Sequence, residues 1–282
     1  MSTDRLDVSG PLAFYRYAVP GKPTASYPIL VLGHALGVDH TMWNWVLPLL
    51  PPGLEVVLWD QPGHGESGLL AISSAQDRAD QTSVIDTARA LRSGLVELGV
   101  ISDGGPRPVI AGLSLGGMVS LAFAEEYPSD LAALSMLSSG AVLLPHDAWF
   151  ERSEKVRSQG QSFLADSTME RWFSKDFREG KGKQAVADTR KTFLATNPDG
   201  YAQCCQLIAG TDMRSGTAGV RVPTLLVIGE DDPGMTPDQG RELAQSLPNS
   251  SLEVVAGTKH MTAVEEPRLV ADLLTELISC VN

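Results

Sequence analysis

Short, continuously apolar stretches alternate with amphipathic stretches along most of this chain. Strands buried on both faces are continuously apolar, whereas apolar residues at helical spacing predict helices that cover a sheet. The expected strands, of which the first should pair with the second, span residues 11–19, 27–33, 54–60, 109–111, 131–137, 223–229 and 252–257. The expected helices span residues 43–50, 82–98, 239–247 and 265–278, with another directly after residue 114. This order predicts an α/β fold with a mostly parallel central sheet and helices on both faces.

One long segment breaks this alternation. Residues 141–219 contain no good buried strand and are rich in polar helical stretches and aromatic residues. We therefore expect a core formed by residues 1–140 and 220–282, and a helical insertion formed by residues 141–219. An insertion at this point is expected to cap the carboxyl edge of the sheet, where open α/β sheets bind their ligands.

The balance of charges argues against two classes of partner. The chain has 34 acidic and 22 basic residues, a formal net charge of −12, and no basic run. Nucleic acid and anionic membrane surfaces are therefore not expected as partners. No apolar run reaches the ~18 residues of a membrane span. The polar N-terminus does not resemble a signal peptide, so we expect a cytoplasmic protein, and the sequence predicts no oligomeric state.

The three cysteines predict neither a disulfide framework nor a metal site. Cys204 and Cys205 are adjacent and Cys280 is distant, so the count is odd and the spacing is unlike that of zinc ligands. We expect them to be small buried residues of a protein in a reducing compartment. The sequence also lacks a Walker-type loop and a metal-spaced cluster of His and Asp, so no cofactor is expected.

A serine flanked by glycines lies where a predicted strand meets a predicted helix. The stretch GLSLG, residues 112–116, follows the apolar residues 109–111 and precedes apolar residues at helical spacing. Glycine allows a turn so tight that a Cβ atom would clash with its neighbours. This setting is typical of a nucleophile elbow, so we predict that Ser114 is a catalytic nucleophile.

A serine hydroxyl is a weak nucleophile, and it needs a base that is itself oriented by a third group. In folds with a nucleophile elbow the order along the chain is serine, acid, histidine. His260 follows the last predicted strand and is therefore the expected base. Asp231 and Asp232 both follow the strand at 223–229. We predict that Asp232, which directly precedes a Pro-Gly turn, is the acid, with Asp231 as the alternative.

The developing negative charge on the substrate oxygen needs preorganised hydrogen-bond donors. One expected donor is the backbone N–H of Leu115, the residue after the nucleophile. The other is the backbone N–H of Leu36, in the loop GHALGVDHTMW after an early strand. A second glycine-rich turn, DQPGHGES at residues 60–67, is expected at the same edge and is interpreted as structural.

With these residues assigned, the chain resembles the serine α/β-hydrolases and, more narrowly, the 3-oxoadipate enol-lactonases. The resemblance covers about residues 15–277 and is carried by LGVDHTMW, GLSLGGMVS, RWFSKDFRE, GYAQCCQLI and TPDQGRELAQSLP. It implies an α/β-hydrolase fold with a helical cap and a cofactor-free lactonase whose triad is Ser114, Asp232 and His260. It also implies that Trp149 is a cap tryptophan that faces the pocket. The expected substrate-binding residues are Val142, Trp149 and Trp172.

One position departs from the pattern of these lactonases. Where they tend to have Asn-Thr-Ala followed by a basic residue, this chain has SSGAV, which ends at Val142. An apolar residue here removes a possible partner for a substrate carboxylate. The cap also contains Arg152, Arg171 and Arg214, but each could equally form a surface or intra-cap ion pair. Because an unpaired buried charge costs several kcal/mol, we expect a substrate with less negative charge than the family's dicarboxylate-derived lactone.

The predicted activity is the hydrolysis of a small lactone through an acyl-enzyme, with a small-molecule lactone or ester as the partner. The main alternative is a carboxylesterase or thioesterase that uses the same triad on an acyclic ester. A lyase that acts on a C–C bond is a less favoured alternative, because the same fold hosts such enzymes. A non-catalytic binding protein is disfavoured because the serine, acid and histidine are all present in the expected order.

Overall fold

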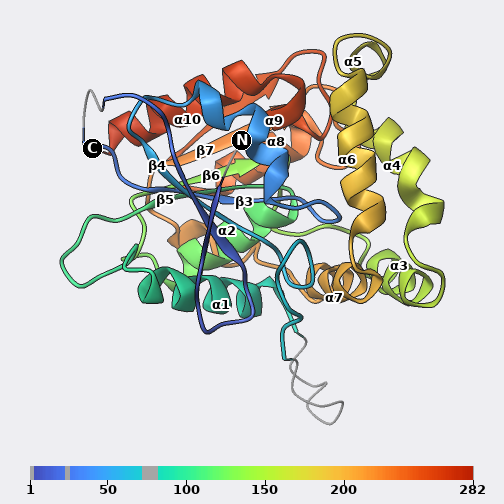
Figure 1. Cartoon of the computed structure of the whole chain (residues 1–282), viewed down its shortest axis with the longest axis horizontal. Helices are drawn as coiled ribbons and strands as arrows, with labels where there is room; N and C mark the ends of the chain where they lie inside the picture. The colour runs from blue at the N-terminus through green and yellow to red at the C-terminus, as the bar shows by residue number, and fades with distance from the viewer. Residues whose placement is uncertain (1–2, 23–25, 72–81, 282) are drawn as a thin grey trace.

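The computed structural model describes residues 3–22, 26–71 and 82–281. Its centre is an eight-stranded sheet with the order β1-β2-β4-β3-β5-β6-β7-β8 (Figure 1). The strands are β1 (Asp4–Leu6), β2 (Phe14–Ala18), β3 (Leu30–Gly33), β4 (Glu55–Trp59), β5 (Val109–Leu113), β6 (Ala133–Leu137), β7 (Thr224–Gly229) and β8 (Ser250–Val255). The strands from β3 to β8 run parallel to one another, and β1 and β2 are antiparallel additions at one edge. The expected α/β fold with a mostly parallel sheet is confirmed.

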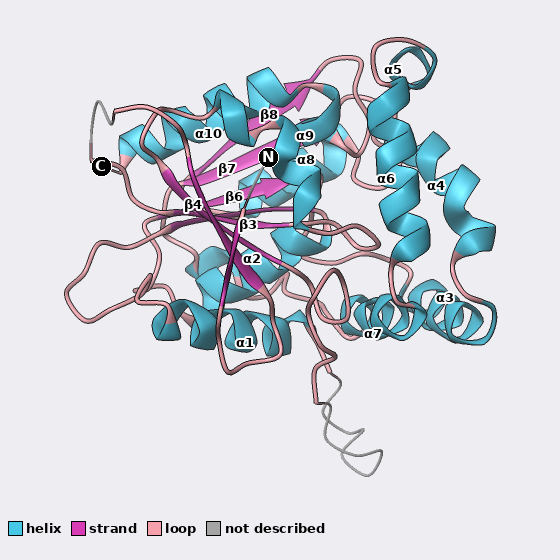
Figure 2. Ribbon diagram, viewed as in Figure 1, coloured by secondary structure: helices cyan, strands magenta, loops and turns pink. Residues whose placement is uncertain are grey.

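Helices cover both faces of the sheet (Figure 2). One layer consists of α1 (Val84–Glu97), α2 (Leu115–Glu126) and α8 (Pro237–Ser246), and the other of α9 (Thr262–Glu265) and α10 (Pro267–Cys280). A capping box formed by Ser83 and Asp86 begins α1. Helix α2 is buried over most of its length because it lies between the sheet and α1. Among the helices of the described residues, none is both long enough and apolar enough to cross a membrane.

The first long strand lies in a different place from the one expected. β2 does not pair with β3; it lies antiparallel to β4, while β3 lies between β4 and β5. Every residue of β3 is buried, which requires a neighbouring strand on each side and helices on both faces. In β2, Arg16 is half-buried and Ala18 is exposed, as suits a strand near the edge of the sheet. The expected pairing of the first two predicted strands is therefore wrong.

One predicted helix has a different form in the structure, and the ends of another are shifted by two residues. The helix expected at residues 43–50 is a pair of short 3-10 helices, η1 (His40–Trp45) and η2 (Leu47–Leu49). Pro48 has no N–H to donate, so it suits the start of a short helix and would disrupt the interior of a longer one. The last predicted helix, at residues 265–278, is α10, which begins at Pro267 and ends at Cys280; the short helix α9 precedes it.

Helices form most of the segment between β6 and β7, and this segment lies beyond one end of the sheet (Figure 1). The helices are α3 (His146–Gln159), α4 (Ala165–Trp172), α5 (Lys175–Glu179), α6 (Lys183–Ala195) and α7 (Pro198–Ala209). A β-bridge joins Val142 to Asp212, and the Met213 N–H donates to the Ala141 carbonyl oxygen at 2.9 Å. These contacts hold the two ends of the segment together at the core. The division of the chain at residues 141 and 219 stays a prediction.

Candidate active site

Ser114 lies at the sharp turn between β5 and α2. Its φ of 55° and ψ of −115° lie outside the regions that L-residues favour, and such strain persists only where the surroundings hold it. A Cβ atom on Gly112 would clash with the backbone of Gly116, and one on Gly116 would clash with the backbone of Gly33. The Ser139 hydroxyl also donates to the Ser114 carbonyl oxygen at 2.7 Å. The glycines therefore permit a backbone geometry that brings Ser114 to the wall of a pocket.

His260 and Asp232 form a hydrogen-bonded pair on the loops that follow β8 and β7. Asp232 Oδ2 lies 2.9 Å from Nδ1 of His260, and Asp232 Oδ1 accepts from the N–H groups of Gly234 (2.8 Å) and Met235 (3.2 Å). Burial alone would raise the pKa of Asp232, but the His260 ring and these hydrogen bonds together lower it. The ionised carboxylate then accepts the hydrogen of His260 Nδ1. This tautomer leaves Nε2 free to accept a proton.

The loop after β3 and the first turn of α2 carry the two predicted oxyanion donors. Leu115 is the first residue of α2, where backbone N–H groups have no partner within the helix, and Leu36 lines the pocket. Gly37, the residue after Leu36, is held by hydrogen bonds at both its N–H and its carbonyl oxygen. The Gly37 N–H donates to His64 Nε2 at 2.9 Å, and the Gly37 carbonyl oxygen accepts from Thr196 Oγ1 at 3.0 Å.

The protonation state of His64 explains its contact with this loop. Burial, with a smaller effect from nearby His34, lowers the pKa of His64 to about 3, so the ring is neutral at neutral pH. Nδ1 lies 2.9 Å from the Pro62 carbonyl oxygen, so Nδ1 carries the hydrogen and Nε2 accepts from Gly37. The turn at residues 60–67 therefore supports the loop that carries Leu36, in line with its structural interpretation.

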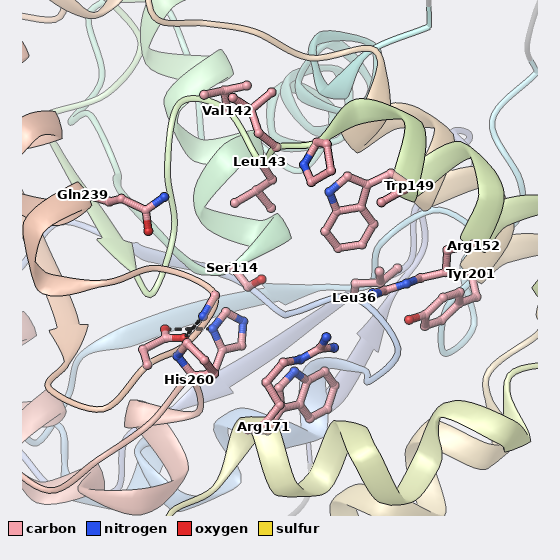
Figure 3. Close-up of a pocket in the computed structure, with 17 residues that line it drawn as sticks. Leu36, Ser114, Val142, Leu143, Trp149, Arg152, Arg171, Tyr201, Gln239 and His260 are labelled. Atoms are coloured by element: carbon pink, nitrogen blue, oxygen red, sulfur yellow. Dashed lines mark hydrogen bonds and ion pairs between the residues drawn. The ribbon is translucent and has the colours of Figure 1, made fainter.

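Most of the predicted site residues meet in one pocket with a volume of about 270 Å³ (Figure 3). The predicted residues that line it are Leu36, Ser114, Val142, Trp149, Trp172, Asp232 and His260. Leu115 is absent from this lining, but the role expected of it needs only its backbone N–H. The residues that line the pocket without having been assigned to it are Leu143, Leu144, Pro145, Ala148, Arg152, Arg171, Tyr201, Pro233, Gly234 and Gln239.

The three arginines that the sequence left open have different surroundings. Arg214 is exposed and forms an ion pair with Asp212 at 2.5 Å, whereas Arg152 and Arg171 line the pocket. The position of Arg152 had a signal in the sequence, because it follows Trp149 by one helical turn and so shares a helix face with it. Arg171 directly precedes Trp172, but adjacent residues do not share a helix face, so the sequence did not place Arg171 at the pocket.

Cys204 and Cys205 are buried in α7, as expected, but Cys280 is exposed near the end of α10, so the expectation of burial is wrong for this residue; all three are free thiols. Burial raises the pKa values of Cys204 and Cys205, so both remain protonated at neutral pH. Across residues 3–22, 26–71 and 82–281, no group of three or more His, Cys, Asp or Glu side chains is arranged to hold a metal ion.

Comparison with known proteins relates this chain to one protein family. Residues 30–273 match the family described as the alpha/beta hydrolase family. The 3-oxoadipate enol-lactonase 1 of Acinetobacter baylyi is 27% identical over 255 residues, which cover 90% of each chain. A crystal structure of the enol-lactonase from Burkholderia xenovorans matches with a TM-score of 0.84 and 25% identity, covering 98% of this chain and 100% of that one. The resemblance inferred from the motifs is therefore confirmed.

A second solved structure is similar in fold. The thermophilic esterase from Thermogutta terrifontis matches with a TM-score of 0.83 and 22% identity, covering 100% of this chain and 99% of that chain. The same fold thus occurs in a protein described as an enol-lactonase and in one described as an esterase.

Proposed function

Because this chain belongs to the alpha/beta hydrolase family, we propose that it opens a small lactone through an acyl-enzyme formed on Ser114. The observation that carries this proposal is the 2.9 Å contact between His260 Nδ1 and Asp232 Oδ2, in a pocket that Ser114 also lines. The enol-lactonase relatives favour a lactone over an acyclic ester. The reaction consumes only the lactone and water.

In the first half of the cycle, Ser114 Oγ attacks the lactone carbonyl carbon while its proton passes to Nε2 of His260. The carbonyl oxygen takes up an electron pair and becomes an oxyanion. When this intermediate collapses, the ring C–O bond breaks and the released oxygen takes the proton from His260. A released enol is a better leaving group than an alkoxide and converts to the ketone.

In the second half, water transfers a proton to Nε2 of His260 as its oxygen attacks the acyl carbonyl carbon. The bond to Ser114 Oγ then breaks, and the serine recovers its proton from His260 while the carboxylic acid departs. The ionised Asp232 stabilises the imidazolium form of His260 in both halves.

The backbone N–H groups of Leu36 and Leu115 would hold the oxyanion. Leu115 lies at the N-terminus of α2, where the helix dipole also favours negative charge. One donor of this kind contributes about 10²–10³ to kcat in related sites. The loop of Leu36 is supported by the two hydrogen bonds to Gly37, so this donor needs little reorganisation during the reaction.

Residues 141–219 would act as a cap in this enzyme. Val142, Trp149 and Trp172 reach the pocket from this segment, whereas Ser114 and His260 reach it from the core. A pocket built from both parts would limit the access of bulk water to the oxyanion, and this would strengthen the electrostatic interactions that stabilise it.

Steady-state kinetics on small enol-lactones and on p-nitrophenyl esters would test the proposal, with Ser114→Ala as the matched variant. We expect higher kcat/KM on the lactones. We also expect kcat to fall by several orders of magnitude in Ser114→Ala, because the triad acts as a unit. Its melting temperature should change little. Faster turnover of the acyclic esters would favour an esterase or thioesterase, and retention of more than about a tenth of kcat in Ser114→Ala would contradict a serine mechanism.

A further inference from the structure

His260, the base proposed above, reaches the pocket from the loop that follows β8 (Figure 3). Its two neighbours in the chain are held through their backbone N–H groups. The Lys259 N–H donates to Glu265 Oε1 at 2.7 Å, and the Met261 N–H donates to the Trp172 carbonyl oxygen at 3.0 Å. The Trp172 ring also lies beside the His260 ring, with 6.4 Å between the ring centres and 22° between the planes. These contacts fix the backbone from which the imidazole extends.

Glu265, the last residue of α9, is a buried acid that the catalytic cycle proposed above does not use. While its Oε1 accepts from the loop of His260, its Oε2 accepts from both the N–H (2.9 Å) and the hydroxyl (2.6 Å) of Ser174. Ser174 lies in the inserted helical segment, between α4 and α5 and two residues after Trp172. A single carboxyl group therefore joins the loop of the proposed base to the part of the helical segment that lies beside the base.

The hydrogen bonds of Glu265 account for the presence of an acid at this buried position. A buried carboxyl group is costly unless hydrogen bonds replace its contacts with water. Each oxygen of Glu265 accepts from a backbone N–H, which is an arrangement that suits a carboxylate, because a carboxylate only accepts. Hydrogen bonds to a carboxylate are shorter and stronger than those between neutral groups. The side chain therefore holds Lys259 and Ser174 at a fixed separation.

Glu266, the next residue, also joins the core to the helical segment, but in a different way. It forms an ion pair with Lys181 at 2.8 Å, and both side chains are accessible to solvent, with exposed fractions of 41% and 68%. Exposed ion pairs of this kind contribute little to stability. Among the described residues, the Glu266 carboxylate has no hydrogen bond to the loop of His260. Of the two adjacent acids, only Glu265 connects the helical segment to the backbone beside the proposed base.

We propose that Glu265 is a positioning residue, which fixes the place of His260 relative to Ser114 and fastens it to the helical segment. This proposal rests on the catalytic function proposed above. Asp232 orients the imidazole through Nδ1, whereas Glu265 and the Trp172 carbonyl oxygen hold the backbone that carries it. Transfer of the serine proton to Nε2 needs both, since a displacement of about 1 Å can cost about 10²-fold in rate.

Glu265→Gln keeps the size of the side chain but replaces one acceptor oxygen with an NH2 group, which donates. Because both oxygens of Glu265 face a backbone N–H, either orientation of the amide brings two donors together, at Lys259 or at Ser174. We expect kcat on an enol-lactone to fall by about tenfold to hundredfold while KM changes little, because a displaced base weakens only transition-state binding. A folded variant with wild-type kcat would overturn the proposal, whatever its melting temperature.

Glu266→Gln is the matched control, because it makes the same exchange one residue further along and removes only the accessible ion pair with Lys181. It should behave as the wild type. Ser174→Ala is a milder variant, which removes the hydroxyl donor but keeps the Ser174 N–H, so kcat should fall by about twofold to tenfold. In the Glu265→Gln background the same change should add little, because residues in one hydrogen-bond network are not additive. If Glu265→Gln does not fold, a wild-type kcat in Ser174→Ala would overturn the proposal.

The rate of covalent labelling by a fluorophosphonate tests the position of the base without a lactone. In this reaction Ser114 Oγ forms a bond to phosphorus, the P–F bond breaks, fluoride leaves with the electron pair, and the serine proton passes to Nε2 of His260. Labelling would be measured well below the melting temperature of each variant, so that a purely structural role would not change it. We expect Glu265→Gln to be labelled about tenfold to hundredfold more slowly than the wild type and Glu266→Gln.

Labelling and turnover together separate this proposal from the lactonase function. If Glu265→Gln is labelled slowly but the wild type hydrolyses no lactone, the positioning role stands and the lactonase function fails. If the lactones are hydrolysed but labelling and kcat are the same in Glu265→Gln and the wild type, the positioning role is wrong and the lactonase function stands. Absence of labelling in the wild type would contradict the serine mechanism on which both proposals rest.

Discussion

Asp231 and Asp232 are neighbours with the same side chain, but their surroundings differ. The Asp232 side chain is fully buried, and it contacts His260 at 2.9 Å. Asp231 is exposed, and its backbone N–H donates to the Thr258 carbonyl oxygen at 2.9 Å. Only Asp232 therefore has the partner that a catalytic acid needs.

Exchange of each acid for its amide is expected to separate their roles. Asp232→Asn should lower kcat on a lactone substrate by roughly 10³–10⁴-fold, because the amide no longer selects the reactive tautomer of His260. Asp231→Asn removes an exposed charge and should stay close to wild-type activity. The measurement is steady-state turnover of both variants, with circular dichroism to confirm that both are folded. The reverse pattern would make Asp231 the acid.

Glu125, near the end of α2, has a half-buried carboxyl group that the proposed chemistry does not use. One of its side-chain oxygens is buried and has no hydrogen-bond partner among the described residues, and the carboxyl group lies against Gly216. Burial, with a smaller effect from neighbouring Glu126, raises the pKa of Glu125 from its usual 4.5 to about 7. The folded chain therefore holds a proton that the unfolded chain loses at lower pH.

The raised pKa of Glu125 makes the free energy of unfolding depend on pH. As pH rises from 4.5 to about 7, the unfolded state loses the proton first, so the wild-type protein loses stability across this window. Glu125→Gln cannot ionise, so its melting temperature should exceed that of the wild type by a growing amount from pH 4.5 to 7 and by a constant amount above it. Thermal unfolding of both proteins across this range is the measurement, with the exposed Glu242→Gln as the control. A constant difference at all pH values would contradict the raised pKa.

The loop after β3 illustrates how separate elements fix one catalytic group. Thr196, at the end of α6, donates to the Gly37 carbonyl oxygen, and His64, in the turn after β4, accepts from the Gly37 N–H. The Leu36 N–H belongs to the peptide just before these groups, and the two contacts fix the backbone directly after Leu36. The helical segment therefore contributes to the proposed oxyanion site as well as to the walls of the pocket.

Removal of the Thr196 hydroxyl is expected to affect turnover more than substrate binding. Thr196→Val keeps the shape of the side chain but cannot donate to Gly37, so kcat should fall by about tenfold while KM changes little, because misplacement of a donor weakens transition-state binding. Thr196→Ser keeps the hydroxyl and should recover most of the activity. A variant Thr196→Val that only melts at a lower temperature, with kcat unchanged, would limit Thr196 to a structural role.

The buried strands were predictable from the sequence, but their order was not. Each residue of β5, β6 and β7 is buried, and a continuous apolar run of this length in a polar chain is typical of a strand covered on both faces. The apolar pattern does not say which strand is the neighbour of which, so the pairing of β2 was assigned to the wrong strand. β1 (Asp4–Leu6) lies at the edge with two exposed residues, and no apolar pattern marks it.

The candidate site was predictable where the chemistry restricts the type and order of residues. Ser114 stands in a glycine pattern with few other uses, and the expected chain order then leads to His260. The positions of Arg152 and Arg171 at the pocket were not predictable to the same degree, because an arginine on a helix can equally form a surface ion pair. Arg190 does so, and only its position in space distinguishes it from Arg171.

At the scale of the whole molecule, the net charge and the local charge of the pocket have opposite signs. The chain has a formal net charge of −12, whereas the pocket contains two arginines without carboxylate partners among the described residues. An anionic lactone therefore approaches through a repulsive field and meets attraction only inside the pocket. The two effects act over different distances, so salt should screen them differently.

Changing the ionic strength tests whether long-range repulsion and short-range attraction act on the substrate in this way. The Debye length falls from ~30 Å at 0.01 M salt to ~8 Å at 0.15 M, and partly buried contacts are screened much less than distant charges. Added salt should then remove more repulsion from the distant carboxylates than attraction from Arg152 and Arg171. Two lactones with the same ring would be compared, one whose side arm ends in a carboxylate (the carboxylate lactone) and one whose side arm ends in a carboxamide. We expect kcat/KM for the carboxylate lactone to rise by about twofold over this range, while that for the carboxamide stays constant. A fall in kcat/KM with added salt for the carboxylate lactone alone would mean that attraction extends well outside the pocket, and that the net charge of −12 does not govern the approach of the substrate.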